Sequence, residues 1–289
     1  MSTEGDGWFT EIYPEHRGLT FRVRSVLESR RSRFHQIEVI ETEDAGKLLV
    51  LDGAVMLSTR DEFTYHEMLA HVPLFTHPEP RRVLIVGGGD GGTAREVLRH
   101  PSVERVDVVE IDEEVIEVCR EHLPETAGSF DDERVRLVVA DGAEFVRQTS
   151  ERYDVVLVDS TDPVGRAAVL FEAPFYRHVE RLLAPGGWMA AQSESPFLGA
   201  DLIRKLHTDL APIFAQLRLY LVPVVAYPSG QWSFTLGGGN EDGAGASGMA
   251  DPPAPTREPP ADWRLRYYTS EVHRAAFVLP PFVRELVGE

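Results

Sequence analysis

The 289-residue sequence contains a single cysteine, Cys119, which excludes a disulfide bond within the chain. Proteins of the reducing cytoplasm commonly have such a low cysteine content. No run of about 18 apolar residues occurs, so we expect no membrane-spanning helix. The start of the chain is acidic and has no apolar segment typical of a secretory signal. These absences together predict a cytoplasmic protein without a membrane partner.

Lysine is also scarce, since Lys47 and Lys205 are the only two and arginine supplies the other positive side chains. Lysine and arginine together number 29 against 47 acidic residues, which gives a formal net charge of −18. Such a charge would repel nucleic acids, and we expect no nucleic-acid partner. The acidity is compatible with a cationic substrate, but adaptation to solubility or salt explains it at least as well.

The hydrophobic pattern divides the chain into two parts. Apolar and polar residues alternate over 19–58, so residues 1–60 are predicted to form a small N-terminal domain with an antiparallel β-sheet. From Asp61 a helical pattern begins, and apolar strands then alternate with helices. This alternation predicts a doubly wound, mostly parallel, Rossmann-like α/β sheet of the methyltransferase type for residues 61–289. Its segment 237–260, rich in Gly, Ala and Pro, is predicted to be a flexible linker or loop.

Polar residues follow the predicted strands of the second part directly. In doubly wound sheets, ligands bind beyond the carboxyl ends of the strands. Carboxylates at these ends suit a ligand that carries hydroxyl donors or positive charge. The strands are expected at 83–89, 105–112, 135–142, 153–163 and 188–195, and the acids at their ends are Asp90, Glu110, Asp141, Asp159 and Glu194.

A glycine-rich turn follows the first of these strands. Gly87, Gly89 and Gly92 satisfy the spacing GxGxxG, which lets a backbone turn tightly and approach a ligand closely. Glu110, at the end of the next strand, is placed to accept hydrogen bonds from the hydroxyls of an adenosine ribose. The pattern fits nicotinamide-dependent dehydrogenases and adenosylmethionine-dependent transferases alike. A turn that is rich in glycine only for packing is the structural alternative.

Asp90 lies within this turn, where a dinucleotide enzyme would bind its pyrophosphate. A carboxylate there would repel a pyrophosphate, and also the carboxylate of ordinary S-adenosylmethionine, by roughly 4 kcal/mol at about 4 Å. The same group would attract the ammonium that decarboxylated S-adenosylmethionine presents at that end. A simpler alternative is that Asp90 caps the helix that follows.

Two carboxylates, Asp159 and Asp162, lie three residues apart where the fourth strand ends, and Pro163 stiffens this loop. An amine with a pKa near 10 is protonated at neutral pH and must lose a proton before it can attack. One carboxylate could accept that proton while the other holds a distal ammonium. A capped loop or a metal site would also use such acids, but no His/Cys cluster supports a metal, and we predict none.

The sequence at this point resembles the spermidine synthase family of polyamine aminopropyltransferases. The resemblance rests on GWFTE (7–11), RDEFTYHEML (60–69), VLIVGGGDGG (83–92), DSTDP (159–163) and YPSGQWSF (227–234), whose order is more specific than any one motif. It implies aminopropyl transfer from decarboxylated S-adenosylmethionine to a diamine, foremost putrescine, which yields spermidine and methylthioadenosine. It further implies that the nucleoside is a co-substrate, that no cofactor is tightly bound, and that the protein is a homodimer or homotetramer.

The resemblance also implies a role for each matching residue on the amine side. Asp159 is implied to be the general base, while Asp90 and His66 orient the aminopropyl and amine chains. Trp8 is implied to help close the pocket. Ordinary core packing is the alternative for His66 and the aromatic residues. The residues implied to bind the diamine are Tyr65, Asp162, Glu194, Tyr227 and Trp232.

On the nucleoside side, the resemblance implies that Glu110 binds the ribose. Asp141 is implied to accept from the adenine amino group, and Gly142 to permit close approach, although Asp-Gly is also a common turn. The complete set implied to bind the nucleoside is Gly87, Gly89, Asp90, Glu110, Asp141 and Gly142.

Several positions depart from the family's pattern. They surround the amine pocket, so the acceptor stays open among putrescine, cadaverine, agmatine and longer amines. A methyltransferase, a non-catalytic binder of nucleosides or polyamines, and a dehydrogenase are the other classes; Asp90 argues against the first and the last. The departures are His35 for a common Gln, Thr59 for an acid, Arg166 in place of a Gly-Pro continuation, Ser195 for an acid, and Ala226 for a Thr.

Overall fold

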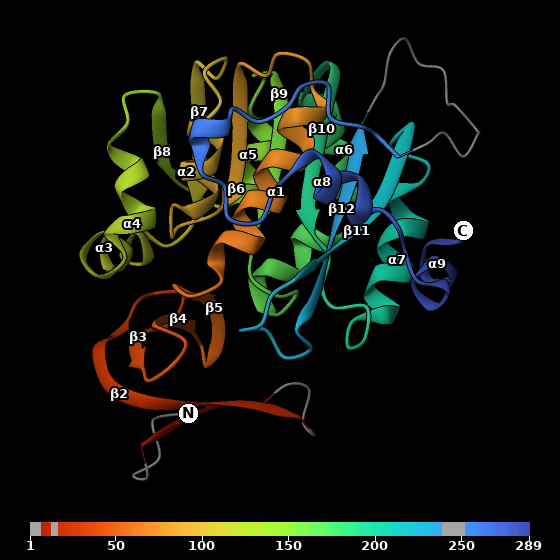
Figure 1. Ribbon diagram of the computed structural model, residues 1–289. Coiled ribbons are helices and arrows are strands. Elements are labelled where there is room, and N and C mark those ends of the chain that lie inside the picture. Colours follow the sequence, from red (N-terminus) through yellow and green to blue (C-terminus); the bar gives the residue numbers. More distant parts are fainter. Residues whose placement is uncertain (1–6, 13–16, 239–251) are drawn as a thin grey trace.

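The computed structural model describes residues 7–12, 17–238 and 252–289, and it contains two β-sheets. The smaller one is a five-stranded antiparallel sheet in sequential order, as predicted for the N-terminal part. Figure 1 shows it below the larger sheet, in red and orange. Its strands are β1 (Trp8–Ile12), β2 (Gly18–Arg31), β3 (Gln36–Thr42), β4 (Lys47–Leu51) and β5 (Ala54–Ser58).

The larger sheet has seven strands in the order β11-β12-β10-β9-β6-β7-β8. The five strands from β10 to β8 in this order are parallel, and β11 and β12 are antiparallel, which confirms the mostly parallel α/β class. The strands end a few residues earlier than predicted. Glu110 and Asp159 are the last residues of their strands, and Asp90, Asp141 and Glu194 lie two or three residues beyond theirs. The strands are β6 (Arg82–Gly87), β7 (Arg105–Glu110), β8 (Val135–Val139), β9 (Tyr153–Asp159), β10 (Leu183–Gln192), β11 (Gln216–Pro223) and β12 (Gln231–Gly238).

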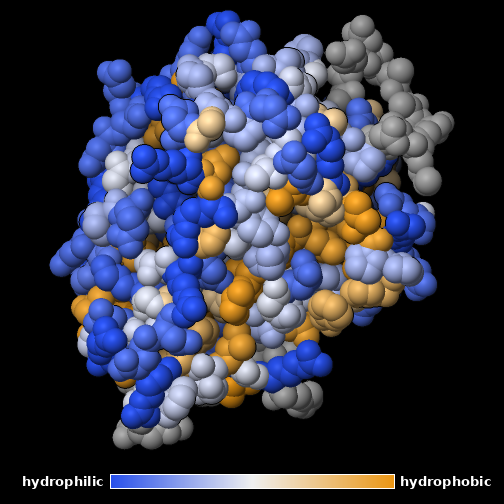
Figure 2. Space-filling view, in the orientation of Figure 1, coloured by the Kyte–Doolittle hydropathy of each residue, from blue (hydrophilic) through white to orange (hydrophobic). Residues whose placement is uncertain are grey.

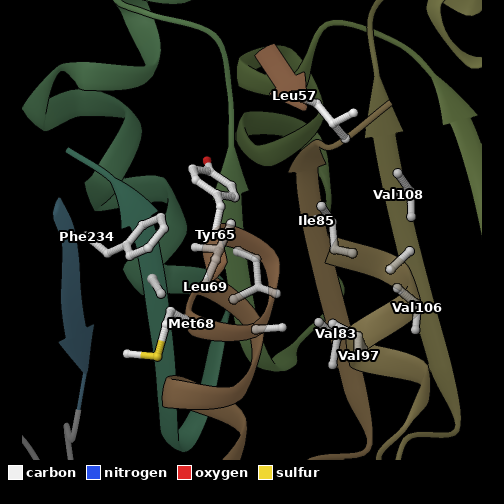
Figure 3. Close-up of a cluster of buried hydrophobic side chains, with 14 of the residues drawn as sticks. Leu57, Tyr65, Met68, Leu69, Val83, Ile85, Val97, Val106, Val108 and Phe234 are labelled. Atoms are coloured by element: carbon white, nitrogen blue, oxygen red, sulfur yellow. The ribbon is translucent and has the colours of Figure 1, made fainter. Parts of the chain in front are cut away.

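Helices cover both faces of this sheet because successive strand side chains point to opposite sides. Leu84 and Val86 of β6 join one buried cluster, whereas Val83 and Ile85 join another, which includes Met68 and Leu69 of α1 (Figure 3). Hydrophilic residues cover most of the surface in view, and hydrophobic residues gather right of its centre (Figure 2). The longer helices are α1 (Glu62–Thr76), α2 (Gly92–Leu98), α3 (Glu113–His122), α5 (Gly142–Gln148), α6 (Ala173–Leu182), α7 (Ala200–Leu210), α8 (Ser270–Ala276) and α9 (Pro281–Val287), and α4 (Pro124–Ala127) is a single turn.

The predicted flexible linker over 237–260 differs from the structure at both ends. Residues 237 and 238 continue β12, because a strand needs no large side chain to pair with its neighbours. Thr256 and Arg257 hydrogen-bond to backbone carbonyls at the end of α1, so this part is a fixed loop. Residues 239–251 lie outside the described residues. No helix in the described ranges combines the length and apolar character that a membrane span requires.

Candidate functional site

A cavity of about 560 Å³ lies beyond the carboxyl ends of β6, β7 and β9. Leu49, Leu51 and Met56 of the N-terminal sheet line its other side. Most of the acids and aromatic residues expected at the site therefore meet in one space between the two sheets. The predicted residues that line the cavity are Tyr65, His66, Gly87, Gly89, Asp90, Glu110, Asp141, Gly142, Asp159, Asp162 and Tyr227.

The glycine turn brings β6 and β9 together at the cavity floor. Gly87 has φ +85°, and a Cβ there would lie 2.1 Å from the backbone oxygen of Asp159. The N–H of Gly88 donates to that same oxygen at 2.9 Å. Only glycine at position 87 allows this contact, which fixes Asp159 beside the turn.

The Asp159 carboxylate accepts two side-chain hydrogen bonds. Tyr65 of α1 donates to Oδ1 at 2.9 Å, and Thr93 of α2 donates to Oδ2 at 2.6 Å. Burial, and next the negative charge of Asp90, raise the pKa of Asp159 above its ordinary value. A carboxylate that is oriented in this way and has a raised pKa is suited to accept a proton.

Asp90 faces His66 across the cavity wall. The two side chains approach to 3.3 Å, between Asp90 Oδ1 and His66 Nε2. Burial disfavours the charge on Asp90, but His66, the N–H of Gly92 and the charge of Arg95 together outweigh burial and lower the pKa of Asp90. Asp90 Oδ1 also accepts from the N–H of Gly92 at 2.7 Å, in the first turn of α2. Asp90 therefore contacts the start of α2 and also lines the cavity, so the two interpretations of this residue do not exclude each other.

Glu110 and Asp141 lie at the nucleoside side predicted from the sequence. Glu110 Oε1 accepts from the N–H of Asp112 at 2.9 Å, and burial raises the pKa of Glu110 to about 7. Asp141 caps α5, since its Oδ1 accepts from the N–H groups of Ala143 and Glu144. His35, which stands where the family often has Gln, lines the cavity with its Nδ1 3.0 Å from Asp112 Oδ2.

Asp162 lies in a loop that is tied to the end of β10. The side-chain amide of Gln192 donates to the backbone oxygens of Ser160 and Thr161, both at 3.3 Å. Burial raises the pKa of Asp162, and a hydrogen bond with Glu194 partly offsets this rise. Glu194 itself does not line the cavity and is 1% exposed, so it forms a second layer behind Asp162.

Glu11 is a third acid at this end, and the sequence interpretation missed it. It belongs to β1, is 5% exposed, and accepts from the N–H of Val55 at 3.3 Å. Burial raises its pKa to about 7, and the charge of Asp162 adds to the rise. The available signal was the acid at the end of GWFTE, but no strand was assigned to that segment.

The aromatic residues form a connected group of which only part faces the cavity. Tyr65 and Tyr227 both line it, with ring centroids 6.1 Å apart. Tyr227 donates to the backbone oxygen of Met56 at 2.8 Å, which joins the two sheets. Trp232 packs its ring against Tyr227 at 4.7 Å and does not line the cavity. Trp8 is also absent from the lining and is 41% exposed, so the structure does not place it as a pocket closure.

Ligand atoms of His66, Asp90 and Asp159 lie within 4.8 Å of one another. Three such groups could hold a metal ion in principle. Glu62 and Asp90 raise the pKa of His66 well above its ordinary value, against the opposing effect of burial. The carboxylates of Asp90 and Asp159 are also suited to an organic cation, which they can bind through charge and as hydrogen-bond acceptors.

The comparisons with known proteins agree with this geometry. Residues 62–243 match the spermine/spermidine synthase domain, and residues 7–59 match the spermidine synthase tetramerisation domain. Polyamine aminopropyltransferases of Shouchella clausii and Bacillus subtilis are 45% and 44% identical over 280 residues, covering 97% of this chain and 98% of each relative.

Two solved structures are similar over nearly the whole chain. A spermidine synthase in complex with the transition-state analogue AdoDATO has a TM-score of 0.88 and 39% identity, over 99% of this chain and 97% of that one. The spermidine synthase of Thermotoga maritima has a TM-score of 0.87 and 39% identity, over 99% and 96%. The chain therefore belongs to the spermidine synthase family of polyamine aminopropyltransferases, and it is a transferase of this kind.

Proposed function

We propose that the protein transfers the aminopropyl group of decarboxylated S-adenosylmethionine to putrescine and releases spermidine and methylthioadenosine. The observation that supports this most is that Asp159 and Asp162, three residues apart, line one cavity and both have raised pKa values. One acid is then available for the proton of the attacking amine and the other for a second ammonium. The similarity to a spermidine synthase with bound AdoDATO supports the choice of nucleoside.

In the proposed reaction, the neutral amine attacks the methylene carbon beside the sulfonium. The new C–N bond forms as the C–S bond breaks, and methylthioadenosine leaves with the bonding electron pair. Asp159 accepts the proton of the amine, while Tyr65 and Thr93 hold its carboxylate in place. Because the leaving group is neutral, orientation and proton transfer are the contributions that the protein must make.

The other acids and the glycine turn are assigned to binding. Asp90 holds the ammonium of the aminopropyl chain, opposite His66. Glu110 accepts from the ribose hydroxyls, and Asp141–Gly142 lies at the adenine, beside Gly87 and Gly89. Asp162 holds the distal ammonium of the diamine, with Glu194 and Glu11 behind it as additional negative charge.

We further propose that the chain works as a cytoplasmic homotetramer whose N-terminal sheet, within residues 1–60, mediates assembly. The match of residues 7–59 to a tetramerisation domain supports self-association. Apolar side chains that are exposed on β1 and β2 would suit such an interface. They include Ile12, Val26 and Leu27, which are 56%, 42% and 37% exposed. The remainder, residues 61–289, forms the catalytic domain.

The test is turnover of the purified protein with decarboxylated S-adenosylmethionine and a panel of putrescine, cadaverine and agmatine. Mass spectrometry reads methylthioadenosine and the amine product. Spermidine from putrescine at the highest kcat/KM supports the proposal. Higher kcat/KM with another amine keeps the mechanism and changes the acceptor, and methyl transfer from ordinary S-adenosylmethionine contradicts the mechanism.

A further inference from the structure

A buried row of alternating charges leads away from the cavity through His66. Its Nε2 lies 3.3 Å from Asp90, and its Nδ1 lies 2.6 Å from Oε2 of Glu62, one helical turn earlier in α1. Arg95 of α2 binds both carboxylate oxygens of Glu62, at 3.1 and 2.8 Å. His66 and Glu62 are 3% and 8% exposed, so water contributes little to this arrangement.

The geometry determines the charge of the imidazole. Each ring nitrogen of His66 faces a carboxylate, and only the doubly protonated ring can donate from both nitrogens. A neutral ring would lose one of these two contacts, so that either Asp90 kept only the Gly92 N–H or Glu62 kept only Arg95, and the loss of a buried charged contact is costly. Glu62 does not line the cavity, so it contacts His66 from outside the space that a substrate would occupy.

Position 92 shows how closely the parts fit. A Cβ on Gly92 would lie 2.2 Å from Cε1 of the His66 ring and 2.3 Å from Nδ1. The missing side chain therefore lets the imidazole lie against the first turn of α2, where Gly92 also donates to Asp90. The third glycine of the turn thus makes room for the histidine ring.

We propose that Glu62, held by Arg95, is a positioning residue that keeps His66 doubly protonated and thereby keeps Asp90 oriented and ionised beside Asp159. This inference rests on the proposed roles of Asp90 and Asp159. Two carboxylates in one cavity repel each other before any cation binds, and the His66 cation reduces that repulsion. The neighbours that face His66 are Glu62 and Tyr65 of α1, Asp90 of the turn and Asp159 of β9.

The sign of the pH dependence follows from the raised pKa of His66. In the wild type, the ring stays charged through the neutral range, and its stabilising contact is lost only as pH rises through this raised value. Glu62→Gln removes one of the two carboxylates that hold the proton. The pKa of His66 then falls toward its ordinary value, so the ring becomes neutral at a lower pH than in the wild type.

The direct test is histidine NMR on the full chain, with the His66 signal assigned through His66→Asn. The buried rings of His207 and His273 should behave differently, since burial lowers the pKa of each to about 4. We expect a His66 ring that is still protonated at pH 7 in the wild type and that loses its proton at a lower pH in Glu62→Gln than in the wild type. A wild-type His66 that is neutral at pH 7 would overturn the proposal, and this reading requires no turnover.

Steady-state kinetics provide a second test of the proposed role of Glu62. We expect Glu62→Gln to lose roughly 10- to 100-fold in kcat, with a loss that grows as pH rises, and to raise KM for the nucleoside more than for the amine. Glu62→Asp retains the charge and should recover part of the loss. Glu104→Gln is the matched control, because Glu104 is an exposed partner of Arg81. A loss in Glu62→Gln that is equal at every pH, with no change in the His66 titration, would contradict the proposal.

Discussion

Asp159→Asn is the substitution that examines the proposed chemistry most directly. The side chain keeps its shape and loses only its ability to accept a proton. At pH 7, an amine with a pKa near 10 is neutral in about one molecule per thousand. A positioned general base contributes roughly 10²- to 10⁴-fold. We therefore expect kcat to fall by that factor at pH 7, which corresponds to about 3–5 kcal/mol.

The structure predicts that this deficit depends on pH. Without a base, the variant must use amine that is already neutral, and that fraction rises about tenfold per pH unit up to the pKa of the amine. The logarithm of kcat/KM should therefore rise with a slope of about one from pH 7 to 10 and approach the wild-type value. KM for the nucleoside should change little, because Glu110 and Asp141 are untouched.

Thr93→Val is the control for altered geometry. It removes the 2.6 Å donor to Asp159 Oδ2 but leaves the carboxylate in place. We expect a loss of about tenfold or more from one charge-assisted hydrogen bond, without the rising slope. The initial rate of methylthioadenosine release is measured for the wild type, Asp159→Asn and Thr93→Val. Near-normal turnover of Asp159→Asn at pH 7, or a deficit that is constant from about pH 7 to 10, would refute the assignment of Asp159 as the base.

Two further predictions concern binding. Asp162→Asn should raise KM for the diamine roughly 10- to 100-fold, because it removes a charged partner from the ammonium, while KM for the nucleoside stays constant; steady-state kinetics with each substrate varied decide this. The affinity for methylthioadenosine should weaken as pH falls below about 7, since the pKa of Glu110 is raised to about 7 and a protonated carboxyl is a poorer acceptor for two ribose hydroxyls. Calorimetry across that range tests it, and an equal weakening in Glu110→Gln would show that another group is responsible.

The acids that line the cavity could be predicted from the sequence because of a general property of parallel sheets. Their strands all end at one edge, so residues that follow separate strands, such as Asp90, Glu110 and Asp159, must meet there. The antiparallel N-terminal sheet was likewise readable from alternation over β2 to β5. These predictions depend on local patterns and on one topological rule.

The site residues that could not be placed from the sequence depend on packing between segments that lie far apart in the chain. β1 is only five residues long and pairs with β2, so Glu11 could not be placed beside Asp162 from its neighbours in sequence. Trp232 and Glu194 belong to the right region but lie behind the residues that line the cavity. The packing of the folded chain decides whether a side chain lines the cavity or lies behind the lining. The residues next to it in the sequence do not show which.

The net charge of −18 and the charge of the pocket are separate features of this protein. Many surface acids pair with arginine or lie in water, where salt screens their field beyond about 8–10 Å. The pocket behaves differently, because burial raises the pKa values of Asp159, Asp162 and Glu11, and His66 is a cation among them. A bound diammonium ion would supply the positive charge that these acids lack and would lower their pKa values. If the proposed function holds, selection for a diammonium substrate arises from these few buried carboxyls and would persist in a protein with a neutral surface.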